Sequence, residues 1–114
     1  MEKRLSKFYE SLGRRVKKLR EKQKLNQYQL SEKAEISEKY LSRIECGTVK
    51  CSTDIISRIA KALGISVDFL VNGGTKEDGN IQMAAAMLKK LSPQQQDVII
   101  DIAQRLEDYM IKGK

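Results

Sequence analysis

Apolar residues in this chain recur at intervals of three and four, and this spacing limits the fold more than any other feature of the sequence. Leu12, Val16 and Leu19 show it near the start, and Ile59 and Leu63 show it again further along. A period near 3.6 places such residues on one face of an α-helix, whereas a half-buried strand needs strict alternation. The sequence therefore predicts an all-α protein.

Capping residues mark where the first helices begin and end. Asn26 followed by Gln29 has the pattern of a capping box, and Ser37 is a typical N-cap residue. Gly47 and Gly64 supply the left-handed residue that often ends a helix. The expected helices span about 7–22, 27–34, 38–45 and 53–63, and a fifth, short helix begins after Ser66. Together these five helices can enclose a small core.

The chain changes character after residue 71. Residues 72–80 contain three glycines and predict a flexible linker. Beyond it a helix is expected over 81–91, and Ser92-Pro93-Gln94-Gln95 has the pattern of a strong helix start. We therefore expect a five-helix domain over 1–71, a linker over 72–80 and a two-helix hairpin over 81–114.

Charge is unevenly distributed along the chain, which has a net charge of +7. Residues 1–71 contain 16 Lys and Arg against 9 Asp and Glu, while residues 72–114 contain six of each kind. A basic segment attracts polyanions, of which nucleic acid is the commonest in cells. A membrane surface is the competing partner, but a polybasic membrane anchor usually comes with an exposed apolar helix face or a lipidation signal, and we find neither next to the basic residues.

Other classes of protein are disfavoured. No run of about 18 apolar residues predicts a membrane span, and the first residues lack the apolar stretch of a secretion signal, so we expect a cytoplasmic protein. Cys46 and Cys51 stand five apart in a chain without histidine, which does not match zinc spacing. We expect two free thiols, with a redox-sensing pair as the weaker alternative. Neither a cofactor nor a metal is expected.

Residues 27–45 predict two short helices joined by a tight break, which is the arrangement of a helix-turn-helix. The apolar residues expected to lock the pair together are Leu30, Ala34, Ile36, Leu41 and Ile44. The outer face of the second helix is then free to enter the major groove of DNA, which accommodates one α-helix.

The residue types on that outer face suit base recognition. Arg43 can donate two hydrogen bonds to guanine, Lys39 can reach guanine or a phosphate, and Ser42 can donate or accept. Glu38 can accept a hydrogen bond from cytosine, although a solvated charge is an equal alternative for this residue. We expect phosphate contacts at positions flanking this face, namely Gln27, Ser37, Tyr40 and Lys50. For Tyr40, packing on the neighbouring helix is the alternative.

At this point the chain resembles the phage-repressor-like (Xre) helix-turn-helix family. The resemblance covers residues 12–73 and rests on elements that occur in order: LR at 19–20, LNQYQL at 25–30, ISEKYLSRIECG at 36–47 and IAKALGISVDFL at 59–70. It implies a five-helix DNA-binding domain whose third helix reads DNA. The DNA-facing positions that it implies are Gln27, Ser37, Glu38, Lys39, Ser42 and Arg43. It further implies a structural ion pair between Arg20 and Glu45.

Three positions depart from the family pattern. Glu35 stands at the turn, where the family usually has a glycine with positive φ. Ser31 replaces a common alanine on the second helix, and Cys51 replaces a common proline before the fourth.

An apolar stripe in the C-terminal region must be covered by something. Its expected members, which we assign to dimerisation, are Leu88, Leu91, Val98, Ile99, Ile102, Leu106 and Tyr109. Either the hairpin folds onto its own domain, or two copies meet in a four-helix bundle. The second alternative places two recognition helices in successive major grooves and is favoured.

The expected function is that of a sequence-specific, dimeric transcriptional regulator, most simply a repressor, that binds a near-palindromic operator in double-stranded DNA. The alternative is an antitoxin or partner-controlled interaction protein whose C-terminal stripe binds another polypeptide. An enzyme is disfavoured because the sequence has no histidine and no nucleotide-binding loop. RNA binding by stacking is disfavoured because only six aromatic residues are present.

Overall fold

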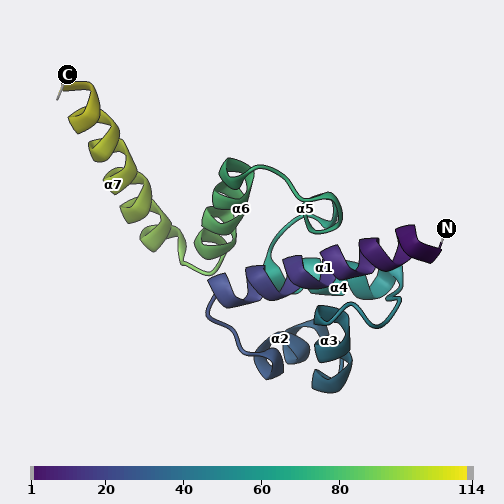
Figure 1. Ribbon diagram of the computed structural model, residues 1–114. Helices are drawn as coiled ribbons and strands as arrows, with labels where there is room; N and C mark the ends of the chain where they lie inside the picture. Colours follow the sequence, from purple (N-terminus) through teal and green to yellow (C-terminus); the bar gives the residue numbers. More distant parts are fainter. Residues whose placement is uncertain (1, 113–114) are drawn as a thin grey trace.

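A computed structural model describes residues 2–112 of the chain, and within them every regular element is an α-helix (Figure 1). The seven helices are α1 (Glu2–Lys22), α2 (Gln27–Ala34), α3 (Glu38–Glu45), α4 (Thr53–Leu63), α5 (Val67–Asn72), α6 (Lys76–Lys89) and α7 (Pro93–Lys112). The predicted all-α fold is confirmed. The first helix begins five residues earlier than the apolar pattern indicated.

The expected caps form where the sequence placed them. The side-chain oxygen of Asn26 accepts a hydrogen bond from the main-chain N–H group of Gln29. In return, the side-chain oxygen of Gln29 accepts a hydrogen bond from the main-chain N–H group of Asn26. Ser37 and Ser52 each accept a hydrogen bond from the N–H group three residues further on. These side chains satisfy amide groups that have no acceptor inside their helix.

The linker expected over 72–80 is corrected by the structure. Helix α6 begins at Lys76, and only residues 73–75 separate it from α5. Thr75 and Asp78 form a capping box at its start, which outweighs the low helix propensity of the surrounding glycines. Gly79, which the composition assigned to the linker, is buried within the helix and lies against the ring of Phe69.

Helices α1 to α5 enclose the hydrophobic core. Its largest fully buried side chains are Leu12, Val16, Leu30, Leu41, Ile44, Ile59, Leu63 and Leu70. Helix α1 lies across the middle of the molecule, with α2 and α3 on one side and α5 and α6 on the other (Figure 1). This arrangement gives α1 two separate faces of contact, one with α3 and one with α5.

A buried glycine allows α1 and α3 to approach closely. A Cβ atom at Gly13 would overlap the carbonyl oxygen of Ile44 and lie 2.8 Å from that of Glu45. These are main-chain atoms, so they cannot move aside without shifting α3. The sequence pattern did not single out Gly13, because a glycine inside a helix carries no signal of what packs against it.

Arg20 and Glu45 form the expected ion pair between α1 and α3. The Nε and Nη2 groups of Arg20 donate hydrogen bonds to the two carboxylate oxygens of Glu45 at 2.7 and 3.0 Å, and Nη1 donates to the carbonyl of Leu25 at 2.8 Å. The side-chain amide of Gln27 donates to the same carboxylate at 3.0 Å. Both charged residues are buried. The hydrogen bond with Glu45 raises the pKa of the Arg20 guanidinium, which stays charged.

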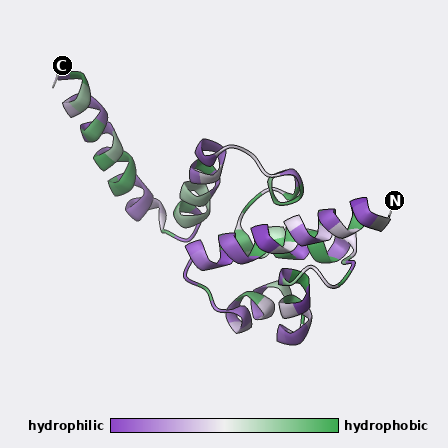
Figure 2. Cartoon of the chain, viewed as in Figure 1, coloured by the Kyte–Doolittle hydropathy of each residue, from purple (hydrophilic) through white to green (hydrophobic). Residues whose placement is uncertain are grey.

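The C-terminal helices differ in how they contact the domain. Helix α6 packs on it through Met83 and the buried Ala86, whereas α7 has no buried residue and extends away from the body (Figure 1). Green segments recur along the length of α7 in Figure 2, and its large apolar side chains are exposed in a single chain. Of the two helices of the expected hairpin, α6 therefore packs on its own domain and α7 does not.

Replacing Glu35 with glycine should stabilise the protein. Glu35 adopts φ 58° and ψ 45° at the end of α2, a left-handed conformation that glycine adopts without steric cost. After allowing for the greater freedom of glycine in the unfolded chain, we expect Glu35→Gly to add about 0.5–1 kcal/mol to the free energy of unfolding. Thermal denaturation measures this. Gly47→Ala is the opposite control, because it introduces a Cβ atom at φ 74° and should lower the melting temperature.

Removing one partner of the buried ion pair should be far more damaging than removing both. Arg20→Met leaves the Glu45 carboxylate buried without its cation and should lower the free energy of unfolding by about 3–5 kcal/mol. The double variant Arg20→Met/Glu45→Met should recover most of this loss, because no charge remains buried. Urea denaturation of the three proteins tests the expectation, and equal stabilities for the single and double variants would contradict it.

Candidate nucleic-acid interface

The turn between α2 and α3 consists of residues 35–37 and has a defined geometry. Glu35 is left-handed, as the family pattern implied for this position, and the N–H group of Ile36 donates to the carbonyl of Ser31 at 3.0 Å. Ser37 then caps α3. The two helices are thus fixed relative to each other by main-chain hydrogen bonds and by the buried Leu30, Ala34 and Leu41.

Helix α3 has a buried side and an exposed side. Leu41, Ile44 and Glu45 are buried against the rest of the domain. The four predicted base-contacting residues lie away from it: Glu38, Lys39 and Arg43 are exposed and Ser42 is half-buried. The ion pair of Glu45 with Arg20 therefore anchors the same helix whose outer side chains are free to reach a ligand.

The residues predicted to contact phosphates have different environments. Ser37 is exposed at the start of α3, and its hydroxyl oxygen already accepts from the N–H group of Tyr40, which leaves the O–H group to donate. Lys50 is exposed in the loop after α3. Tyr40 is half-buried and packs against the core, as the packing alternative expected. Gln27 is half-buried, and one amide proton is engaged by Glu45.

Sequence reasoning did not identify Tyr28 as a candidate. It is exposed at the start of α2. A hydrogen bond with Glu32 raises the pKa of its hydroxyl, and the charge of Glu38 on α3 adds to this effect. Tyr28 lies between the two residues of the capping box, Asn26 and Gln29, and that pattern indicates where the helix begins and not what its exposed side chains contact.

The helix-turn-helix itself is not basic. Residues 27–45 contain three Lys and Arg against four Glu, whereas residues 2–22, which form α1, contain nine against three. Lys39 and Arg43 are the cations of α3, and neither belongs to an ion pair within residues 2–112. The excess charge that the sequence assigned to the first two-thirds of the chain is thus concentrated on α1.

The two cysteines are free, and they lie in different environments. Cys46 is exposed at the end of α3, while Cys51 is buried, and burial raises the pKa of its thiol. Cys51 is therefore a packing residue where the family often has proline. In the described part of the chain, no cluster of three or more His, Cys, Asp or Glu residues is placed to hold a metal ion.

None of the helices within residues 2–112 combines the length and the apolar character that crossing a membrane requires.

Comparison with known proteins identifies the family of the chain. The helix-turn-helix family profile matches residues 16–70. The immunity repressor protein of Bacillus phage phi105 is 40% identical over 65 residues, which cover 57% of this chain and 45% of that protein. An uncharacterised HTH-type transcriptional regulator of Mycobacterium tuberculosis is 32% identical over 94 residues, which cover 79% of this chain and 67% of the relative. The chain thus spans less than half of the phage repressor.

Solved structures agree with the sequence relatives. The clp gene regulator ClgR from Corynebacterium glutamicum superimposes with a TM-score of 0.52 and 28% identity, over 70% of this chain and 92% of that one. The apo form of ComR from S. thermophilus superimposes with a TM-score of 0.53 and 31% identity, over 91% of this chain and 36% of that one. The chain therefore belongs to the helix-turn-helix family of DNA-binding transcriptional regulators.

Proposed function

We propose that this protein represses transcription by binding a near-palindromic operator as a dimer, with α3 of each copy in the major groove. The observation that carries the proposal is the two-sided character of α3. One side is held in the core by the Arg20–Glu45 ion pair, and the other presents Lys39 and Arg43 without a carboxylate partner in the described chain. The likeness to a phage immunity repressor supports repression as the outcome.

The proposed division of labour follows from the chemistry of the exposed side chains. The guanidinium of Arg43 donates two parallel hydrogen bonds and suits the O6 and N7 atoms of guanine. Lys39 reaches a second guanine or a phosphate, Ser42 donates or accepts, and Glu38 accepts from cytosine. Phosphate contacts from Ser37, Tyr40, Lys50 and the start of α2 at Gln27 fix the register of the domain on the duplex.

Dimerisation is proposed from the uncovered stripe on α7. The exposed fractions of its large apolar side chains are 57% for Val98, 42% for Ile99, 56% for Ile102, 58% for Leu106 and 75% for Tyr109. Large contiguous apolar patches on a protein surface mark interaction sites. Leu88, in the last turn of α6, and Leu91, in the segment between α6 and α7, are half-buried and extend the stripe toward the domain. A second copy supplies the same stripe and completes a four-helix bundle.

A dimer explains why a small domain with a neutral reading helix suffices for operator binding. Two recognition helices about 34 Å apart contact successive major grooves on one side of the duplex. A function that acts on chromosomal DNA also places the protein in the bacterial cytoplasm. A different polypeptide on the α7 stripe is the alternative, and it would make the chain an antitoxin or a partner-controlled regulator. A stoichiometric partner that co-purifies with the chain would favour that alternative.

Arg43→Ala should weaken operator binding and change its specificity. Loss of one bidentate base contact costs about 1–3 kcal/mol per site and relaxes the preference at one base pair in each half-site. Selection from random duplexes with the wild-type and variant proteins measures both effects. Lys50→Ala is the matched comparison, because a lost phosphate contact should weaken all sequences about equally. Unchanged discrimination by Arg43→Ala would refute the assignment.

Ile102→Asp should convert the dimer to a monomer without unfolding the chain, because Ile102 is exposed in the single chain. Gln104→Asp is the matched control: it introduces the same charge on α7, about 200° around the helix from Ile102. Sedimentation equilibrium at micromolar concentration measures the mass of each protein. A monomeric wild-type chain, or equal dissociation of both variants, would contradict the proposed interface.

A further inference from the structure

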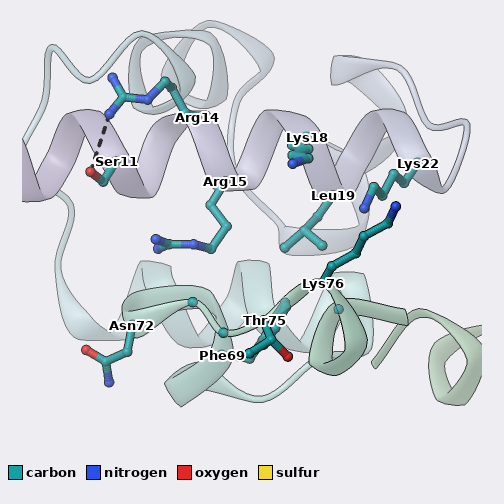
Figure 3. Close-up of a pocket in the computed structure, with 13 residues that line it drawn as sticks. Ser11, Arg14, Arg15, Lys18, Leu19, Lys22, Phe69, Asn72, Thr75 and Lys76 are labelled. Atoms are coloured by element: carbon teal, nitrogen blue, oxygen red, sulfur yellow. Dashed lines mark hydrogen bonds between the residues drawn. The ribbon is translucent and has the colours of Figure 1, made fainter. Parts of the chain in front are cut away.

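A cleft of about 820 Å³ lies between α1 and the junction of α5 with α6 (Figure 3). It is on the far side of α1 from the helix-turn-helix. At 3.6 residues per turn, Lys18 in the cleft wall and Arg20, which contacts α3, point about 200° apart on α1. The cleft therefore lies on the side of α1 that faces away from α3 (Figure 1).

The cleft is lined by cations from two different helices. Arg14, Lys18 and Lys22 come from α1, and Lys76 comes from the first turn of α6. Within residues 2–112 the ion pairs are Arg20–Glu45, Arg58–Asp54 and Arg105–Asp101, so none of these four cations is neutralised by a carboxylate. Figure 3 shows the side chains of Lys22 and Lys76 directed toward each other.

Like charges that face each other across a hollow repel, and an anion between them removes the repulsion. Two acidic residues follow Lys76 on α6. The carboxylate of Asp78 accepts a hydrogen bond from the N–H group of Thr75 at 3.0 Å in the capping box, and Glu77 is exposed. Within residues 2–112 neither of them forms an ion pair with a cation of the cleft.

The walls of the cleft are already in place. Nη1 of Arg15 donates to the carbonyls of Leu70 and Val71 at 2.7 and 3.1 Å and ties the end of α5 to α1. A Cβ atom at Gly73 would lie 3.0 Å from Nε of Arg15, so the glycine lets the main chain pass close to the guanidinium. A preformed site loses less conformational entropy when a ligand binds.

We propose that this cleft binds a small molecule that carries two or more phosphate groups. Four unpaired cations exceed what a single phosphate requires, and phosphate oxygens accept hydrogen bonds from both lysine and arginine. The volume lies in the range of small-molecule sites. Phe69 and Leu19 supply an apolar wall for a part of the ligand that is not phosphate.

The position of Lys76 gives the site a structural consequence. A ligand held by Lys22 and Lys76 joins the DNA-binding domain to α6, the helix that leads into α7. Bound ligand should therefore stabilise the packing of α6 on the domain and raise the melting temperature of the full chain. This expectation concerns the free protein and does not depend on which operator it recognises.

The test uses inorganic tripolyphosphate as the probe and isothermal titration calorimetry on the full chain at constant ionic strength. Wild-type protein should bind one tripolyphosphate per chain in a saturable manner. Lys22→Gln/Lys76→Gln should weaken this binding by about tenfold or more, because two charge-assisted hydrogen bonds are lost. The matched control is Lys17→Gln/Lys61→Gln, which removes two exposed lysines outside the cleft and should change the affinity by less than about twofold.

Several results would overturn the proposal. Binding that is not saturable, or an equal loss in both double variants, would show a general charge effect in place of a site. Equal or tighter binding of an oligo-glutamate peptide of the same charge would assign the cleft to an acidic polypeptide. Loss of operator binding by Lys22→Gln/Lys76→Gln, with the control unaffected, would assign these lysines to DNA. If Lys22→Gln/Lys76→Gln loses tripolyphosphate binding but retains operator binding, the cleft is a site distinct from the proposed DNA-binding surface.

Discussion

The buried ion pair between Arg20 and Glu45 fixes the position of α3 on α1. It is satisfied by four hydrogen bonds that join α1, the loop after it, α2 and α3. A buried charge pair tolerates little displacement, because any lost hydrogen bond leaves a charged group without solvent. Gly13 acts at the same contact by allowing the main chains of α1 and α3 to meet. The orientation of the outer face of α3 thus depends on residues that are buried inside the domain.

Much of this arrangement could be predicted from local sequence patterns, because caps and turns are determined by a few neighbouring residues. The box of Asn26 with Gln29, the cap at Ser37 and the left-handed Glu35 were all found where they were expected. The prediction of a linker over 72–80 was wrong, because its glycines were given more weight than the capping box that Thr75 forms with Asp78. Lys24, left-handed at φ 59° without a glycine signal, was missed. The hydrogen bond from Gln27 to Glu45 was also missed, because residues 27 and 45 are far apart in the sequence and share no local pattern.

The net positive charge and the helix-turn-helix lie on different parts of the domain, whereas the sequence had suggested DNA binding for both. Nearly the whole net charge of +7 is found on α1, whereas the helix-turn-helix has one more acidic than basic residue. A positive field decays over about 10 Å at ordinary salt concentrations. The charge on α1 would therefore contribute weakly to the binding of a duplex at the outer face of α3. Base contacts by a few unpaired side chains then account for more of the specificity. The basic face of α1 is left for another anion.

Helix α6 is the element through which these parts of the molecule meet. Its first turn supplies Lys76 to the basic cleft, its middle packs Met83 and Ala86 on the DNA-binding domain, and its end leads into the uncovered α7. In a dimer joined through α7, the spacing of the two recognition helices is set by how rigidly α6 is held. If the proposed anion bridges α1 and α6, it acts on the contact that would fix half-site spacing in the proposed dimer. The cleft and the operator would then be linked through α6, although the cleft and α3 lie on opposite sides of α1 (Figure 1).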